Sequence, residues 1–399
     1  MRPSSSAPKR HLTALYCLQQ ASYFFAIAGI GAFAVTYLMD KGFAAAQIGM
    51  MLALTNVCSC ALQPVIGSYV DRRSMSLLAG IILRFLSVAL FSFLIIEALR
   101  PPLAVIAFLF MIGSLTFSIT VPLSSSLCAY YSQNGYHIDY GMGSGIGSLS
   151  FSFASLILGY MIAALGSSFM MCFCLAFIVI EILLVLRYPK IEADAQAQRR
   201  SAPSSSLSLG AFCRRYRRFI ATLLGVMCLA ACHAMAENYL IQLFTRLGGG
   251  SEHVGVALFL ACITAAPFLL FFERIQRKTG VIALLRLAGL FYAAKAVLLM
   301  LAPSIGSVYL IELLQTCTYG FLYPPLYYFV GLRIAPADTT KGQTMASSLY
   351  TLGTALGNSL GGTVIDLISL NAMFILAAGI AAAGALLINF TIAKADAAA

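Results

Sequence analysis

Five ionisable side chains lie within long apolar stretches of this sequence, where charge is otherwise rare: Arg84, His233, Glu237, Lys295 and Glu312. An ionisable group inside a membrane is costly and usually marks a functional site. His233 and Glu237 are four residues apart, so they share one face of a helix. These residue types and positions predict a site that handles protons.

Glu237, Lys295 and Glu312 are expected to form a Glu–Lys–Glu cluster. Two carboxylates that share one cation do not both ionise easily, so one of them can take up a proton. We rank Glu237 ahead of Glu312 as the proton carrier, and His233 is a candidate relay. Each assignment has a structural alternative. Lys295 can simply form an ion pair that holds helices together, and His233 can be a hydrogen-bonded packing residue.

Polar side chains in other apolar stretches are candidates to bind a solute: Gln20, Tyr23, Asn56, Tyr130, Asn238, Gln315, Tyr319 and Tyr323. Tyrosine offers a flat face and a hydroxyl group, which suit organic rings. Pro324 and Pro325 break backbone hydrogen bonds and are expected to bend their helix. Some of the polar groups can instead hold helices together. Four carboxylates near expected helix ends are interpreted as interfacial and receive no role: Glu97, Asp139, Glu181 and Asp366.

No nucleophile–base set and no metal motif is present, so we expect no enzymatic activity, no cofactor and no metal. Cys228, Cys232 and His233 could in principle hold a metal ion, but no fourth ligand lies near them in the sequence. Most of the eleven cysteines lie inside apolar runs, where they act as small hydrophobic residues.

The composition is that of a membrane protein. Of the 399 residues, 60% are hydrophobic and 10% are charged, whereas a soluble domain carries about 25% charged residues. Such a chain cannot cover a surface that faces water. The net charge of +11 could suggest nucleic acid, but the charges lie in short loops between apolar runs. We therefore expect a lipid bilayer and no nucleic acid as the partner.

About twelve apolar runs are long enough to cross a bilayer, which needs about 20 helical residues. The runs are residues 12–38, 48–70, 75–96, 103–130, 140–165, 169–186, 219–244, 254–272, 282–302, 308–330, 344–365 and 372–392. The sequence therefore predicts an all-α membrane protein with about twelve transmembrane helices in two six-helix bundles.

Loop charge predicts the orientation of these helices. Lysine and arginine are concentrated at the two ends of the chain and in alternate loops, whereas the opposite loops hold only Lys41, Arg100 and Arg246. Positive loops stay in the cytoplasm. We therefore expect a multi-pass protein of the cell inner membrane with both termini in the cytoplasm.

The chain divides into two halves around a polar segment. Residues 1–188 are predicted to form the first bundle, residues 189–218 a flexible cytoplasmic linker, and residues 219–399 the second bundle. The fifth run carries Gly141, Gly143, Gly145 and Gly147, and the eleventh carries Gly353, Gly357 and Gly361. Small residues at such spacing let helices approach closely, and the repetition indicates an internal duplication. We expect a monomer.

The loop after the second run reads Gly67-Ser68-Tyr69-Val70-Asp71-Arg72-Arg73 and follows Gln63-Pro64. It resembles the signature loop of the major facilitator superfamily, which has a glycine, three residues, and Asp-Arg or Asp-Lys. The resemblance implies that Gly67, Asp71 and Arg72 steady one conformation of a transport cycle. The matching loop after the eighth run keeps its basic end but has Gln276 at the position of Asp71.

More narrowly, the chain resembles the oligosaccharide:proton symporter branch, which includes lactose-permease-like proteins. The stretches Leu62-Gln63-Pro64-Val65-Ile66-Gly67 and Leu314-Gln315-Thr316-Cys317-Thr318-Tyr319-Gly320-Phe321 carry this resemblance. The family's sugar-binding carboxylate and its arginine are replaced by Ser126 and Ser144. Its histidine and proton-carrying glutamate are replaced by Gln315 and Thr318. Lys295 and Glu237 keep a positive and an acidic position. The resemblance therefore implies that the galactoside site is absent and that the family's proton site has either moved or been lost.

The most direct interpretation is a proton-coupled symporter that moves a nucleoside, a glycoside or an aromatic acid by alternating access. A drug-efflux antiporter of the same fold is an alternative, but such proteins usually carry a Gly-Pro pair in the fifth helix, and the 140–165 run has no proline. A non-transporting membrane sensor is a third interpretation, and a sensor would not need the buried charges.

Overall fold

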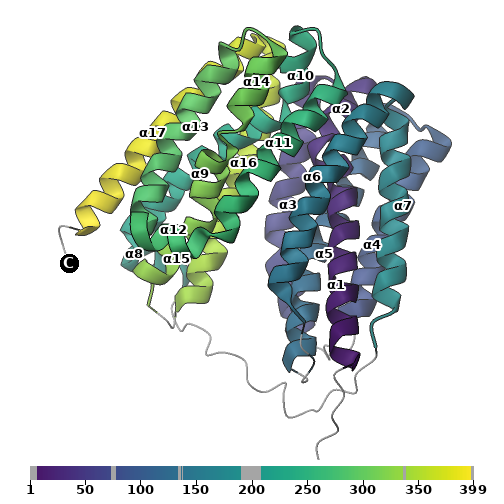
Figure 1. Ribbon diagram of the computed structural model, residues 1–399, viewed down its shortest axis with the longest axis horizontal. Coiled ribbons are helices and arrows are strands. Elements are labelled where there is room, and N and C mark those ends of the chain that lie inside the picture. The colour runs from purple at the N-terminus through teal and green to yellow at the C-terminus, as the bar shows by residue number, and fades with distance from the viewer. Residues whose placement is uncertain are drawn as a thin grey trace, which may run out of the picture. The chain divides into compact units, whose positions relative to one another are not determined.

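The computed structural model describes residues 7–72, 78–133, 136, 138–189, 208–335 and 338–396. All the regular elements among these residues are helices (Figure 1). The first half of the chain contains α1 (Ala7–Ile27), η1 (Ala28–Ala32), α2 (Ala34–Asp40), α3 (Ala45–Arg72), α4 (Leu78–Leu99), α5 (Leu103–Gln133), α6 (Tyr140–Leu165) and α7 (Ser167–Leu186).

The second half begins with a short helix, α8, and then alternates long helices with shorter ones. Its elements are α8 (Leu209–Arg215), α9 (Arg217–Asn238), α10 (Leu240–Arg246), α11 (Ser251–Leu270), α12 (Phe272–Thr279), α13 (Val281–Met300), α14 (Ile305–Glu312), η4 (Thr316–Gly320), α15 (Phe321–Arg333), α16 (Thr339–Leu367) and α17 (Leu370–Asp396). The labels η1 and η4 denote single turns of π-helix.

Each of the twelve predicted runs corresponds to helical structure. Among the described residues, nine single helices are long and apolar enough to cross a membrane, and the pair formed by α1–η1 and α2, bent by 51°, makes a tenth span. The tenth and eleventh runs account for the rest. The tenth is divided between α14, η4 and α15, and the eleventh, α16, is rich in Thr, Ser and Gly, which lowers its hydropathy.

The contacts group the chain into two compact units. The first comprises Met1–Gly42 and Cys58–Arg200, and the second comprises Phe43–Val57 and Ser201–Ala399. The start of α3 therefore packs with the second unit. Most of the predicted linker, residues 189–218, lies outside the described residues, but α8 and the start of α9 fall inside it. The predicted domain boundaries stay a prediction.

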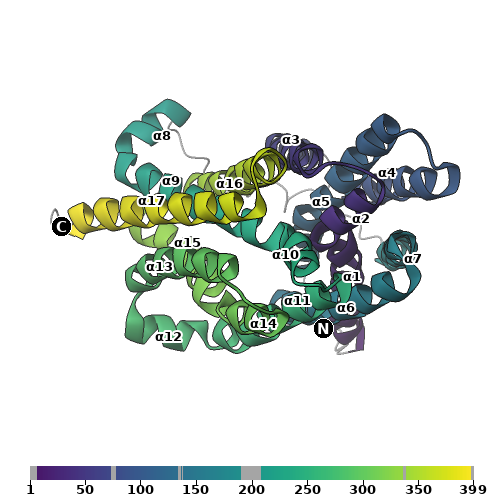
Figure 2. The same ribbon diagram turned by 90° about the horizontal axis from the view of Figure 1, so that it is seen from above.

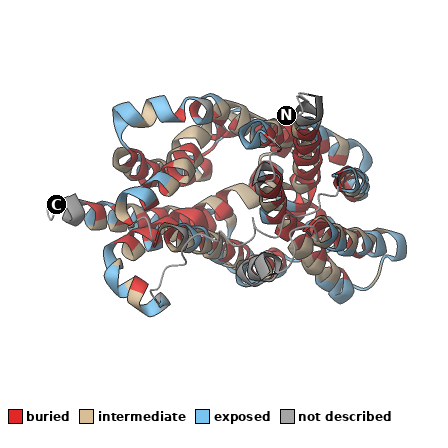
Figure 3. Cartoon of the chain, turned by 90° about the horizontal axis from the view of Figure 1, so that it is seen from below, coloured by how far each residue is buried: buried red, intermediate tan, exposed pale blue. Residues whose placement is uncertain are grey.

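Within the first unit, α1 packs against α6 and α7, and α4 packs against α5 and α7. Within the second unit, α9 packs against α16 and α17, and α17 also lies along α13 (Figure 2). Buried residues lie mainly where the helices of a unit face one another (Figure 3). The outer faces are apolar: Phe91, Leu290 and Phe390 are each at least 60% exposed, as expected of side chains that face lipid.

The predicted glycine spacing allows close helix packing in both units. In the second unit, the Cα atoms of Gly353 and Gly357 face the backbone carbonyls of Met227 and Ala231 on α9, and an added methyl group would collide with them. In the first unit, glycines of α6 instead face the rings of α1 residues: Gly143 meets Tyr16 and Gly147 meets Phe24. The second unit thus brings two backbones together, whereas the first places rings against a backbone.

Candidate functional site

Three charged side chains from three helices of the second unit meet at one point. The Lys295 Nζ atom, on α13, donates hydrogen bonds to Glu237 Oε1 of α9 at 2.6 Å and to Glu312 Oε2 of α14 at 2.8 Å. It also donates to Gln315 Oε1 at 2.9 Å. An ammonium group has three N–H donors, so all the donors of Lys295 are engaged. We call Glu237, Lys295 and Glu312 the triad.

The triad lies where two helices are interrupted. Helix α9 ends one residue after Glu237, and α14 ends at Glu312 itself. The C-terminal end of a helix carries partial negative charge from its free carbonyl groups, so both ends favour the ammonium group between them. Discontinuous helices commonly form the ion and substrate sites of transporters.

Sequence explains part of the second interruption. Pro324 and Pro325 have no N–H groups, so the carbonyls of Gly320 and Phe321 cannot receive the usual helical hydrogen bonds from them. The π-helical turn η4 lies directly before these prolines. The helical interruption thus lies one turn before the prolines, directly after Gln315, and the bend expected from the prolines stays a prediction.

The two carboxylates of the triad have different surroundings. Glu312 is fully buried, and its Oε1 atom has no hydrogen-bond partner among the residues that the structure describes. The side chain of Glu237 is 11% exposed. Its Oε1 atom lies 4.0 Å from His233 Nδ1. If both carboxylates are ionised, the triad carries a net charge of −1, and a single proton makes it neutral.

Aromatic rings continue from the triad. The ring of His233 stacks on Tyr319 with centroids 5.8 Å apart, and Tyr319 stacks on Tyr323 at 5.1 Å. Tyr292 meets the edge of His233, and Tyr350 meets the edge of Tyr323. Neither of these last two tyrosines was predicted as a site residue, although Tyr292 lies three residues before Lys295, a spacing that places both on one helix face.

Two predicted solute-binding residues of the second unit form hydrogen bonds with α16 rather than with the triad. The Asn238 side chain donates to Asn358 Oδ1 at 2.5 Å, and the Asn56 amide, at the start of α3, donates to Thr354 Oγ1 at 3.4 Å. Gln315 is the predicted solute residue that reaches the triad through a hydrogen bond.

Four predicted residues lie in the first unit and have their own surroundings there. Gln20 donates to the Tyr16 hydroxyl at 3.1 Å, Tyr23 stacks on Phe117 at 4.7 Å, and Tyr130 meets the edge of Tyr131 at 5.7 Å. Arg84, predicted as a buried charge, is exposed on α4. Gly67, Asp71 and Arg72 lie in the last part of α3, where the side chains are outside those described.

The four carboxylates interpreted as interfacial fall into two groups. Three of them make contacts typical of helix ends. Glu97 pairs with Lys41 at 3.0 Å, Asp139 caps α6 by accepting from the Met142 N–H at 2.9 Å, and Asp366 accepts from the Ala46 N–H at 2.6 Å. The fourth, Glu181, is buried within the first unit, so its interpretation as an interfacial residue is corrected.

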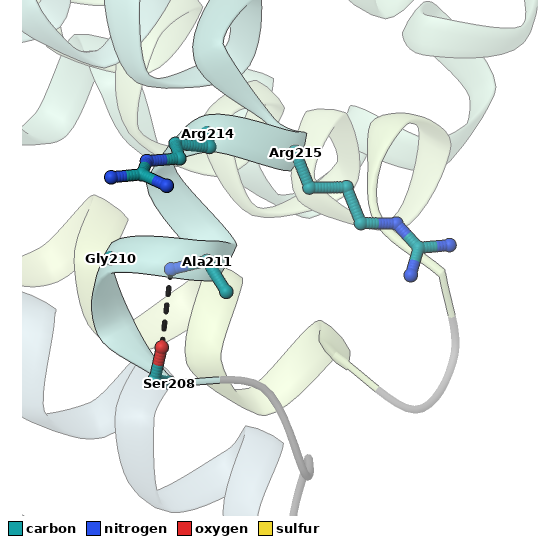
Figure 4. Close-up of a pocket in the computed structure, with 5 residues that line it drawn as sticks. All are labelled: Ser208, Gly210, Ala211, Arg214 and Arg215. Atoms are coloured by element: carbon teal, nitrogen blue, oxygen red, sulfur yellow. Dashed lines mark hydrogen bonds between the residues drawn. The ribbon is translucent and has the colours of Figure 1, made fainter.

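A surface hollow also lies beside α8, lined by Ser208, Gly210, Ala211, Arg214 and Arg215 (Figure 4). Ser208 caps the helix by accepting from the Ala211 N–H, and the two arginine side chains point away from each other. The hollow is open, and nothing but the two arginines gives it charge. The triad therefore remains the candidate site for coupled transport.

Comparison with known proteins agrees with this architecture. The model of the MFS_1 like family matches residues 16–376. Maltose permease of Geobacillus stearothermophilus is 28% identical over 345 residues, which cover 85% of this chain and 82% of the permease. The uncharacterized transporter YwbF of Bacillus subtilis (strain 168) is 23% identical over 382 residues, covering 92% of this chain and 90% of YwbF.

Solved structures share the fold. The nucleoside transporter NupG superposes with a TM-score of 0.79 at 16% identity, covering 97% of this chain and 98% of NupG. The human organic anion transporter MFSD10 (TETRAN) superposes with a TM-score of 0.64 at 18% identity, covering 96% of this chain and all of that one. The predicted fold class and the resemblance to the major facilitator superfamily are confirmed. The chain belongs to the MFS_1 like family and is a multi-pass membrane transporter of the major facilitator type.

Proposed function

We propose that this transporter couples the uptake of a small organic solute to protons, and that the triad is the coupling site. The observation that carries the proposal is the contact of one buried ammonium group, Lys295, with two carboxylates, Glu237 and Glu312. In an apolar interior, a surplus negative charge is costly. Binding one proton removes the surplus, so the triad has two states that differ by one proton.

Either carboxylate can hold this proton. Glu237 is the first candidate from the sequence, and its partial exposure gives water and solute a route to the site. The contacts add an argument for Glu312, because its free Oε1 atom is fully buried and has no cation of its own. We propose that the pair shares a single proton and that removal of either carboxylate abolishes coupling.

The solute class follows from the surroundings of the triad. The stacked rings of His233, Tyr319 and Tyr323 offer flat faces, and tyrosine hydroxyls and the Gln315 amide offer hydrogen bonds. Such groups suit a solute with a ring and several hydroxyls. Maltose permease and the nucleoside transporter NupG are named for solutes of this kind. We therefore propose a glycoside or nucleoside substrate, with an aromatic acid as the next class to test.

Several features of the membrane arrangement belong to the same proposal. The loop charges support an inner-membrane location with both termini in the cytoplasm. Residues 1–188 and 219–399 would then be the two bundles that move in alternating access, joined by residues 189–218. Gly67, Asp71 and Arg72 would steady one conformation of this cycle. We propose that the protein acts as a monomer.

The test begins with a thermal-shift screen of purified protein against maltose, other glycosides, nucleosides and aromatic acids. The solute that stabilises the protein is then supplied in labelled form to proteoliposomes under an inward proton gradient. We expect E237Q and E312Q to exchange this solute across the membrane but not to accumulate it. E252Q is the matched control, because Glu252 lies in the same unit on α11 and contacts His253 rather than the triad.

Three outcomes would contradict the proposal. Proton-driven accumulation by either triad variant would show that the triad is not the coupling site. Accumulation driven only by a sodium gradient would show that sodium, and not the proton, is the coupling ion. Extrusion of the solute in exchange for protons would identify an antiporter instead of a symporter.

A further inference from the structure

A carboxyl group in the first unit has no partner for its charge. Glu181, on α7, is 1% exposed, and neither of its carboxylate oxygens has a hydrogen-bond partner among the described residues. No described lysine, arginine or histidine forms an ion pair with it. The triad of the proposed function does not include this residue, because it belongs to the other unit.

Glu181 faces α1 rather than the outside of the unit. One turn before it on α7, the Phe177 carbonyl accepts a hydrogen bond from Ser22 at 2.7 Å, and the Phe177 ring stacks on Phe25 at 4.5 Å. One turn further back, the Cys174 thiol contacts the Ala26 carbonyl at 3.4 Å. Residues 174, 177 and 181 share one face of a helix, so this face is the one packed on α1.

Polar groups of α1 lie beside the carboxyl group. Gln19 and Tyr23 are its neighbours. The Gln19 side chain is itself held in place, because it donates to Ser124 Oγ at 2.9 Å and accepts from the Tyr188 hydroxyl at 2.8 Å. Gln19 is fully buried, and Ser124 and Tyr188 are less than 9% exposed. A fixed polar network therefore borders Glu181 on one side.

The charged groups with described side chains on the elements packed against α7 are engaged elsewhere or exposed. On α2 and α4, Asp40 accepts a hydrogen bond from Ser167, and Glu97 pairs with Lys41, the residue that follows α2. Arg84 of α4 is exposed, and α6 and η1 contain no charged residue. On α1, the titratable groups with described side chains are Tyr23, Tyr16 and Cys17, and they supply no positive charge.

An ionised carboxylate in such surroundings is far more costly than a protonated one, because neither water nor a cation stabilises its charge. We propose that Glu181 is a second proton-binding residue of this transporter and that it carries a proton in the conformation described here. Its neighbour Tyr23 is a predicted solute residue. A proton on Glu181 and a solute at Tyr23 are therefore placed to influence each other, and this coupling role rests on the proposed function.

The proton itself can be measured without solute or gradient. Infrared spectra of the purified protein at neutral pH report the C=O stretch of protonated carboxyl groups, which shifts in heavy water. We expect E181Q to lose part of this absorption, while E312Q and E237Q keep the Glu181 contribution. E97Q is the matched control in the same unit, because Glu97 forms an ion pair with Lys41, and it should leave this absorption unchanged. An E181Q spectrum that keeps the full wild-type absorption would overturn the proposal.

A second variant guards against a folding defect in the first. A buried carboxyl group that carries no charge can be replaced by an apolar side chain of similar length, so E181M should unfold within a few degrees of the wild type. If neither E181Q nor E181M folds, Glu181 is an ionised residue with a structural partner, and the proposal is wrong. Because neither measurement involves transport, the symport proposal can fail while this one stands, and the reverse also holds.

Discussion

The two units bury carboxyl groups in opposite ways. The second unit places Lys295 between Glu237 and Glu312, and all three of its N–H donors are used. The first unit buries Glu181 without an ion-pair partner among the residues that the structure describes. The same problem, an acid in an apolar interior, is met by ion pairing in one case and by protonation in the other. The ion pairs of the triad therefore hold helices α9, α13 and α14 together. Glu181 forms no such ion pair between the described helices.

The largest effect is expected when the ion pairing is broken. K295M leaves two buried carboxylates without a cation, and removing one partner of a buried ion pair costs about 3–5 kcal/mol. We expect the purified variant to unfold at a much lower temperature and to transport nothing. The triple variant E237Q/K295M/E312Q has no charge to compensate and should recover most of the stability. A K295M protein as stable as the wild type would show that the triad does not hold the helices.

Backbone contacts sharpen the same contrast between the units. An added methyl group at Gly357 collides with the Ala231 carbonyl of α9, which cannot move without its helix, whereas the nearest atoms to one at Gly147 belong to the Phe24 ring. Overpacking costs about 1–3 kcal/mol. We expect G357A to lower the unfolding temperature clearly and G147A to lower it little. Equal decreases in the unfolding temperatures of G357A and G147A would show that the two units pack with similar rigidity.

Much of this structure follows from the sequence because apolar runs and isolated charges are local signals. The triad was predicted as a set, since Lys295 needs acidic partners wherever it is buried. Glu181 was misplaced because its distance from the end of α7 indicates depth but not which face it occupies, and that face depends on packing against α1. The π-helical turn η1 and the neighbours Tyr292 and Tyr350 were missed for the same reason: they depend on contacts between distant segments.

Within the triad, exposure separates the roles of the two carboxylates. Glu237 is 11% exposed and lies beside His233, whereas Glu312 is fully buried. A solute can therefore contact the first but not the second. We expect E237Q to raise the KM for solute exchange about tenfold, which corresponds to about 1.4 kcal/mol, and E312Q to leave this KM nearly unchanged. If E312Q instead raises the KM and E237Q does not, then Glu312 and not Glu237 contacts the solute.

The smallest effect is expected at the ion pair of the first unit, which provides a matched substitution for K295M. Lys41 pairs with Glu97 at 3.0 Å, close to the distances in the triad, but the two side chains are 18% and 12% exposed and lie at helix ends. Pairs that water reaches contribute about 0–1 kcal/mol. Glu97 also keeps the hydrogen bond from the Tyr37 hydroxyl when Lys41 is lost. K41M should therefore unfold within a few degrees of the wild type and retain transport. If K41M is as damaging as K295M, then burial is not what distinguishes the two lysines, and the contrast between the units would have to rest on their contacts instead.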